Sequence, residues 1–148
     1  MKVKIKAGIN ERLLEEVREK VREYLKSIVD DPVEVDGTIS FKYGSVTVGV
    51  EVVPWHEEDV LVNVFSYLAD NVPVDGNLAR TLLELNARFP LGAFAIGAED
   101  SVLYRYALAG ANLDLNELAA AVYTVATVAD SYDEFVGEYD KASRSRID

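Results

Sequence analysis

The segment from Leu78 to Tyr139 constrains the fold of this chain more than any other. Its first part, LARTLLELNARFP, has apolar residues at helical spacing and ends at a proline. A hairpin pattern, LGAFAIGAEDSVLYRYALAG, follows, with two apolar runs on either side of residues 98–100. The last part, LDLNELAAAVYTVATVADSYDEFVGEY, is the most apolar of the long helical patterns. A helix with so broad an apolar surface must pack against another layer, so we predict that a sheet covers it.

The chain before this segment supplies a helix and three strands. Apolar residues at helical spacing predict a helix that begins after Asn10, the N-cap, and ends before Pro32. Alternating runs then predict strands at 39–43 and 46–52, and Pro54 is expected to close their hairpin. A third strand is predicted over 60–68. Residues 1–8 alternate lysine with apolar residues and predict either an extended edge segment or a loose tail.

The third strand is apolar on both faces. Valines occupy positions 60, 62 and 64 on one face, and Leu61, Phe65 and Tyr67 lie on the other. Such a strand lies inside a sheet or is covered on both sides. The second set of apolar side chains is therefore a surplus, which either the core or a partner must bury.

The element order is helix, three strands, helix, two strands, helix. Strands that follow one another through short turns indicate an antiparallel α+β fold with helices packed on the sheet. We expect one domain over residues 1–148, with a polar tail at 141–148. Asp114 and Glu117 have the spacing of a capping box, which places the start of the last helix.

Composition excludes several classes of function. The 148 residues are 49% hydrophobic, include no cysteine and carry a net charge of −11. Disulfides and thiolate metal sites are therefore excluded, and nucleic acids and anionic membranes are disfavoured partners because they attract basic surfaces. No apolar run has the roughly 20 residues of a membrane span, and MKVKIKAG lacks the apolar part of a signal peptide. We expect a cytoplasmic protein.

No residue pattern predicts catalysis. His56 is the only histidine and begins the charged stretch 56–59, whereas a zinc hydrolase motif needs two histidines one helical turn apart. A solvated loop explains this stretch better than a metal site. Ser45 has no nucleophile elbow around it, and Gly44 and Gly49 do not form a phosphate-binding loop. We predict no enzyme activity, no cofactor and no metal.

Several motifs of the second half resemble the YbjN-like family of sensory-transduction regulators, which has a type III secretion chaperone-like fold. They are the residues 82–86 (LLELN), 89–94 (FPLGAF), 102–106 (VLYRY), 115–118 (LNEL) and 129–133 (ADSYD). The first half resembles the family in element order. The resemblance implies a homodimer and a surface that holds peptide segments of partner proteins, without catalysis.

These observations predict a homodimeric module that binds a protein or peptide. The second face of the sheet and the helix at 78–89 would form the dimer contact, and an apolar strip beside the first helix would take a segment with basic flanks. An alternative is a small-molecule sensor with a pocket between sheet and helices, lined by Trp55, Tyr104 and Tyr106. Asn86 either orients a partner or caps the backbone near Pro90. The predicted partner-binding or dimer residues are Trp55, Leu61, Phe65, Tyr67, Leu78, Leu82, Asn86, Tyr104 and Tyr106.

Overall fold

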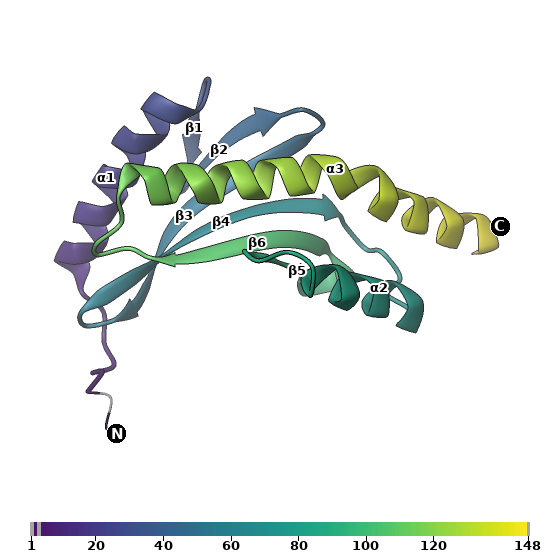
Figure 1. The fold of residues 1–148 in the computed structure, drawn as a ribbon, viewed down its shortest axis with the longest axis horizontal. Helices are drawn as coiled ribbons and strands as arrows, with labels where there is room; N and C mark the ends of the chain where they lie inside the picture. The colour runs from purple at the N-terminus through teal and green to yellow at the C-terminus, as the bar shows by residue number, and fades with distance from the viewer. Residues whose placement is uncertain (1, 3, 148) are drawn as a thin grey trace.

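A computed structural model describes the backbone of residue 2 and residues 4–147, and the side chains as far as residue 139. Three α-helices and five strands follow one another in the predicted order, and one short strand, β1, and one 3-10 turn occur in addition (Figure 1). The helices are α1 (Glu11–Ile28), α2 (Gly76–Asn86) and α3 (Leu115–Ile147), and the 3-10 turn is η1 (Ala98–Asp100). The strands are β1 (Val33–Val35), β2 (Thr38–Tyr43), β3 (Val46–His56), β4 (Asp59–Ala69), β5 (Ala93–Ile96) and β6 (Val102–Ala109).

All six strands form one antiparallel sheet in the order β1-β2-β3-β4-β6-β5. The predicted α+β class is therefore confirmed. β4 lies between β3 and β6, as expected for a strand that is apolar on both faces. The long strands β3 and β4 form the centre, whereas the sheet ends in the short strands β1 and β5.

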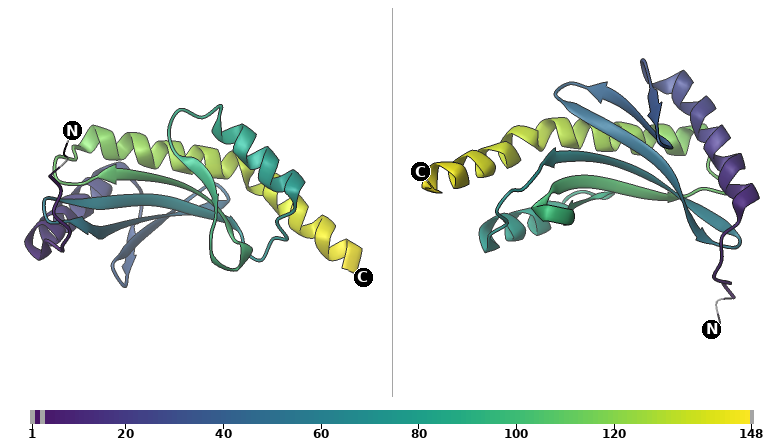
Figure 2. Two further views of the ribbon diagram at one scale, coloured as in Figure 1. Left: turned by 90° about the horizontal axis from the view of Figure 1, so that it is seen from below. Right: turned by 180° about the vertical axis from the view of Figure 1, so that it is seen from behind.

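The helices pack on one face of the sheet, which we call the core face. Val62 and Val64 of β4 are fully buried there, beside Tyr104 and Leu108 of β6. The buried side chains of α1, α2 and α3 belong to the same apolar cluster. Figure 2 shows α3 running along this side of the twisted sheet. The opposite face, which we call the outer face, carries none of the helices that the structure describes.

Local sequence signals fix the helix starts. The Asn10 side chain accepts a hydrogen bond from the Leu13 N–H at 2.9 Å. At α3, Asp114 accepts from the Glu117 N–H at 2.7 Å and Glu117 accepts from the Asp114 N–H at 3.2 Å, so the predicted capping box is present. Each helix therefore begins where side-chain oxygens satisfy free backbone N–H groups.

Two predicted boundaries are wrong: the helix predicted over 78–89 ends at Asn86, and the strand at 46–52 continues past Pro54. Pro54 does not end its strand, because β3 continues to His56 through an irregularity between Pro54 and His56. The pairing of β2 with β3 ends at Val50. Pro54 therefore lies beyond the part of β3 whose backbone N–H groups donate hydrogen bonds to β2. A proline is tolerated at such a bulge on an edge. The charged stretch is accordingly a tight turn at Glu57 and Glu58 between paired residues His56 and Asp59.

The ends of the chain extend from this body. The N-terminal segment contacts the β3–β4 turn through Lys6, whose carbonyl accepts from the Glu57 N–H at 3.0 Å. Met1 and Val3, part of the predicted extended segment, lie outside the described residues, as does Asp148. α3 runs on to Ile147 and so includes most of the predicted polar tail. No helix in the described part of the chain is long and apolar enough to cross a membrane. The division into a single domain stays a prediction.

Candidate functional site

The predicted surplus of apolar side chains lies on the outer face. Leu61 and Phe65 are half-buried, and Tyr67 is 53% exposed. Trp55, at the irregular end of β3, is 50% exposed. No helix in the described part of the chain covers Leu61, Phe65 or Tyr67, so the outer face carries apolar side chains that are open to solvent.

Phe65 has a local role in addition. Its ring lies over Gly49 of β3, its cross-strand partner, where a Cβ atom would come within 2.7 Å of the Phe65 Cζ. The ring also meets Tyr67 edge to face, with 5.9 Å between centroids. Gly49 is thus the position that lets an aromatic side chain lie flat on the sheet.

Three of the predicted surface residues lie in the core instead. Leu78 and Leu82 form the buried side of α2, and Tyr104 is 0% exposed. Tyr106 is half-buried on the core face. These four apolar side chains pack α2 and β6 against the core. We therefore assign none of them to a docking surface.

Asn86 clamps β5 to the end of α2. Its Nδ2 donates to the Phe94 carbonyl at 3.1 Å, and its Oδ1 accepts from the Phe94 N–H at 2.7 Å. Both polar groups of the side chain are used within the chain. The structure therefore favours the backbone-capping interpretation of Asn86.

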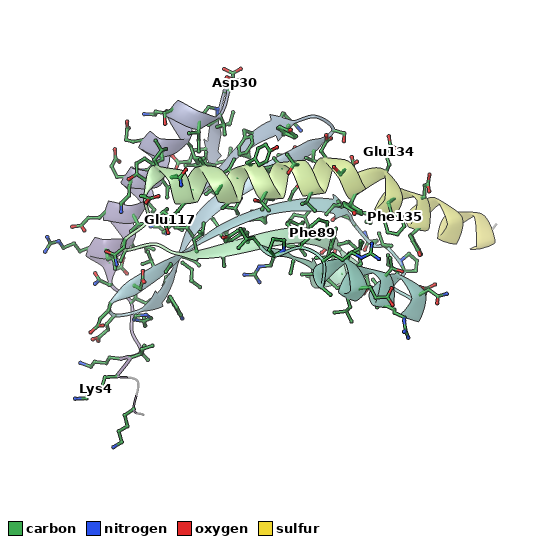
Figure 3. All side chains as sticks on the ribbon, in the orientation of Figure 1. Lys4, Asp30, Phe89, Glu117, Glu134 and Phe135 are labelled. Carbon is green, nitrogen blue, oxygen red and sulfur yellow. The ribbon has the colours of Figure 1, made fainter. Side chains whose placement is uncertain are left out.

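Tyr104 belongs to an aromatic cluster that sequence reasoning missed. Its ring packs edge to face against Phe94 at 5.0 Å and Phe89 at 6.0 Å, and Tyr132 of α3 packs on both phenylalanines. The Tyr104 hydroxyl donates to the Leu91 carbonyl at 2.5 Å, and burial raises the pKa of the phenol above its ordinary 10.0. Phe135, labelled with Phe89 in Figure 3, extends the cluster along α3 and packs edge to face on Tyr132 with 6.4 Å between ring centroids. The rings join α2 and the β5–β6 hairpin to α3.

The small-molecule pocket does not form from the predicted residues. Tyr104 is buried on the core face, whereas Trp55 is half-exposed at the far end of β3, next to the β3–β4 turn. The three side chains therefore do not converge on one cavity. This removes the arrangement on which the sensor alternative depends.

A groove that the sequence did not predict lies on the helix side of the sheet. It runs between the end of α1, strand β2 and the first half of α3, with a volume of about 320 Å³. Phe41 forms its buried floor, and Tyr43 and Tyr123 stand at its sides, with Tyr123 67% exposed. The residues that line it are Ile28, Val29, Asp30, Phe41, Lys42, Tyr43, Ala119, Val122, Tyr123 and Ala126. Tyr123 could have indicated this groove from the sequence, because it is a large aromatic residue that lies outside the buried apolar stripe of its helix.

A polar latch at one end of the groove ties the β2–β3 turn to α3. The Ser45 N–H and hydroxyl donate to Asp130 Oδ1 at 3.0 and 2.9 Å, and the same hydroxyl lies 2.5 Å from Asp133 Oδ2. The hydrogen bonds from Ser45 lower the pKa of Asp130 below its ordinary 3.8. Gly44, with a φ of 52°, allows the β2–β3 turn to approach α3 closely, because a Cβ atom at this position would clash with the Asp130 carboxylate.

His56 is accounted for by the turn in which it lies. Its Nδ1 accepts a hydrogen bond from the Glu58 N–H at 3.1 Å, and its ring packs edge to face on Trp55. Within the described residues, no group of three or more histidine, aspartate or glutamate side chains could hold a metal ion.

The fold and its surfaces define a class: a small α+β domain with helices on one face of an antiparallel sheet, a bare outer face and an apolar groove. Residues 11–139 match the family described as "T3SS (YopN, CesT) and YbjN peptide-binding chaperone 1", and the chain belongs to this family. The resemblance found in the sequence is thereby confirmed.

Comparison of structures gives the same fold. The crystal structure of YbjN from E. coli matches this chain with a TM-score of 0.58 at 12% sequence identity, over 79% of this chain and 91% of that chain. No curated protein matches the sequence.

Proposed function

We propose that this chain is a non-enzymatic, homodimeric peptide-binding module that acts as a chaperone or adaptor. The observation that carries the proposal is the apolar groove between α1, β2 and α3. The family description, which names peptide binding, supports the same conclusion. The predicted cytoplasmic location is part of this proposal.

The groove offers an apolar segment more contact than a flat surface does. Its floor is the ring of Phe41, and its walls include Val122 and the exposed rings of Tyr43 and Tyr123. Tyrosine rings of this kind combine a large apolar area with a hydroxyl that can hydrogen-bond a peptide backbone. A segment of a partner with two or three apolar side chains would bury these rings.

The charges around the groove favour a partner with basic flanks. Asp30 lies at the end of the groove where α1 ends, and its carboxylate reaches into solvent (Figure 3). Asp130 and Asp133 lie at the other end, beyond Ala126 on α3. Lys42, the one cation among the lining residues, turns its ammonium group to Thr47 Oγ1 at 2.6 Å. Lysine or arginine on either side of an apolar segment would therefore meet carboxylates.

Fluorescence anisotropy with a labelled synthetic peptide tests this proposal. The probe has an apolar centre of leucine, valine and phenylalanine between pairs of lysines. We expect saturable binding that weakens at high salt, because part of the attraction is between opposite charges. Tyr123→Ala should weaken binding by about tenfold, equivalent to about 1.4 kcal/mol.

Leu83→Ala is the matched control. Leu83 is 69% exposed on α2, away from the groove-lining residues, so its removal should leave the affinity unchanged. An affinity that Tyr123→Ala leaves unchanged, or that both variants reduce equally, would contradict the assignment of the groove.

A further inference from the structure

Half of strand β6 has an open edge. β5 pairs only with residues 102–105 of β6, and its first residue, Ala93, lies opposite Arg105. On the other side, β6 pairs with β4 as far as Ala109. Figure 1 shows β5 lying along the part of β6 nearest α2. Residues 106–109 therefore have a neighbouring strand on one side alone.

Two backbone hydrogen bonds establish which groups of β6 lie on this edge. On the β4 side, the Gly110 N–H donates to the Val60 carbonyl at 2.9 Å. On the β5 side, the Gly97 N–H donates to the Ser101 carbonyl at 2.8 Å. The backbone groups of successive residues in a strand point alternately to its two neighbours. The even-numbered residues of β6 therefore face β4, and the odd-numbered residues face the line of β5.

Ala107 and Ala109 are the odd-numbered residues that β5 does not reach. In the register of β5, Leu91 would lie opposite Ala107, but Gly92, with a φ of 75°, interrupts the extended backbone between Leu91 and β5. The Leu91 carbonyl accepts from the Tyr104 hydroxyl instead. Within the described residues, no backbone hydrogen bond from outside the sheet reaches Ala107 or Ala109. Their N–H and C=O groups are thus free to pair with an added strand.

The side chains along this edge leave room for such a strand. Ala107 and Ala109 are small and exposed, and a hollow of about 480 Å³ beside them is lined by residues 90–93 and by residues 105–107 of β6. Tyr106 and Leu108 are half-buried on the core face, so an apolar side chain of an added strand would cover their open sides. Charged residues or proline usually protect a sheet edge from pairing, and neither occurs at residues 106–109.

Arg105 sets the charge that the added strand should carry. Its side chain is exposed and lies on the outer face, as that of Ala107 does, two residues along the strand. It takes part in no ion pair within the described part of the chain. A residue that pairs with Ala107 would have Arg105 as a diagonal neighbour on the same face. An acidic side chain there would therefore meet the guanidinium group.

We propose that the open edge of β6 binds an extended segment of another protein as an additional strand, antiparallel to β6 and in line with β5. The residues opposite Ala107 and Ala109 form the backbone hydrogen bonds and are acidic. The residue between them is apolar and covers Tyr106 and Leu108. This site goes beyond the proposed function, because the groove lies at β2, on the far side of β3 and β4.

An NMR titration with a synthetic peptide that alternates valine and glutamate tests the proposal. We expect the backbone amide signals of Ala107 and Ala109 to shift and their hydrogen exchange to slow, because each N–H gains an acceptor. N-methylation of the glutamates should weaken binding at least about tenfold, since it removes the donors that face β6. N-methylation of the valines is the matched control. It should leave the affinity unchanged, because the N–H groups of the valines point away from β6.

Arg105→Glu tests the same site from the side of the chain. It should reverse the preference, so that a peptide alternating valine and lysine binds better than the glutamate peptide. Amide shifts confined to groove residues such as Tyr123, no binding of the glutamate peptide, or an equal loss from both patterns of N-methylation would overturn the proposal. The lysine-flanked peptide and Tyr123→Ala test the groove in a separate experiment, so a failure at one site is distinguishable from a failure at the other.

Discussion

The ring of Phe65 covers Gly49 of the neighbouring strand so closely that a Cβ atom on Gly49 would lie 2.7 Å from the Phe65 Cζ. The ring buries Gly49, and the absence of a side chain at Gly49 lets the ring lie close to the sheet, where it is half-buried. The relationship fixes how far Phe65 projects from the outer face. It therefore links the stability of β3 to the shape of the outer face.

A double-mutant cycle measures this link. Gly49→Ala in the native chain should lower the free energy of unfolding by about 1 kcal/mol, because the new methyl group displaces the ring. In a Phe65→Ala background the same change should raise it by about 0.5–1 kcal/mol, since alanine loses less backbone freedom than glycine on folding. Urea unfolding gives all four values.

Gly76→Ala is the control for this cycle, because no atom lies near the position of its Cβ. It should have the same effect in both backgrounds. Additive effects of Gly49→Ala and Phe65→Ala would mean that the ring does not restrict position 49.

The latch between Ser45 and Asp130 predicts a pH dependence. The pKa of Asp130 is lower in the folded chain than its ordinary 3.8, so its carboxylate stabilises the fold above that pH. This contribution is lost as the pH falls through the lower, folded value. We expect Asp130→Asn to be less stable than the native chain at neutral pH, with the difference disappearing in strong acid. Thermal unfolding across this range measures the difference, and a gap that persists below pH 2 or so would assign it to another cause.

Asn86 should matter for stability and not for binding. Asn86→Ala leaves the N–H and carbonyl of Phe94 without their partners, which should lower the free energy of unfolding by about 1–3 kcal/mol. Asn77→Ala, an exposed position on the same helix, should be nearly neutral. Peptide affinity, measured by anisotropy on folded protein, should be the same for both variants. A stable Asn86→Ala variant that binds the peptide poorly would support the partner-orienting interpretation instead.

Trp55 is the only tryptophan and lies half-exposed at the end of β3, so its emission tests whether the proposed dimer covers that end of the sheet. It is half-exposed in the single chain, so its emission should shift to longer wavelength as dilution dissociates the proposed dimer. The shift should follow the dissociation seen by sedimentation. An emission spectrum that does not change while the dimer dissociates would place Trp55 outside the interface.

The sequence predicted the features that depend on local spacing. The two faces of β4 follow from the alternation of Val62 and Val64 with Leu61 and Phe65, because period two assigns a side to each residue. The helix starts follow from Asn10 and from the capping box at Asp114, because caps act within one turn. The fold class follows from the order of these elements.

What depends on contacts between distant segments could not be predicted. Tyr104 and Tyr67 are both tyrosines in apolar strand patterns, but Tyr104 is buried against Phe89 and Phe94 on the core face, whereas Tyr67 faces solvent. Whether an apolar face meets the core or a partner is decided by which side the helices take, and alternation does not specify this. The groove arises likewise from segments far apart in the chain, around Phe41 and Tyr123.

The length of α3 has a practical consequence. At about 1.5 Å per residue, its 33 residues span roughly 50 Å, whereas the 11-residue strands beneath it span roughly 37 Å. Its last turns therefore project past the sheet, as Figures 1 and 2 show. This overhang is a natural handle: a biotin or dye attached along residues 141–147 stands clear of both the groove and the outer face. Immobilising the protein there leaves each surface free, so that the two can be assayed separately on one sensor chip.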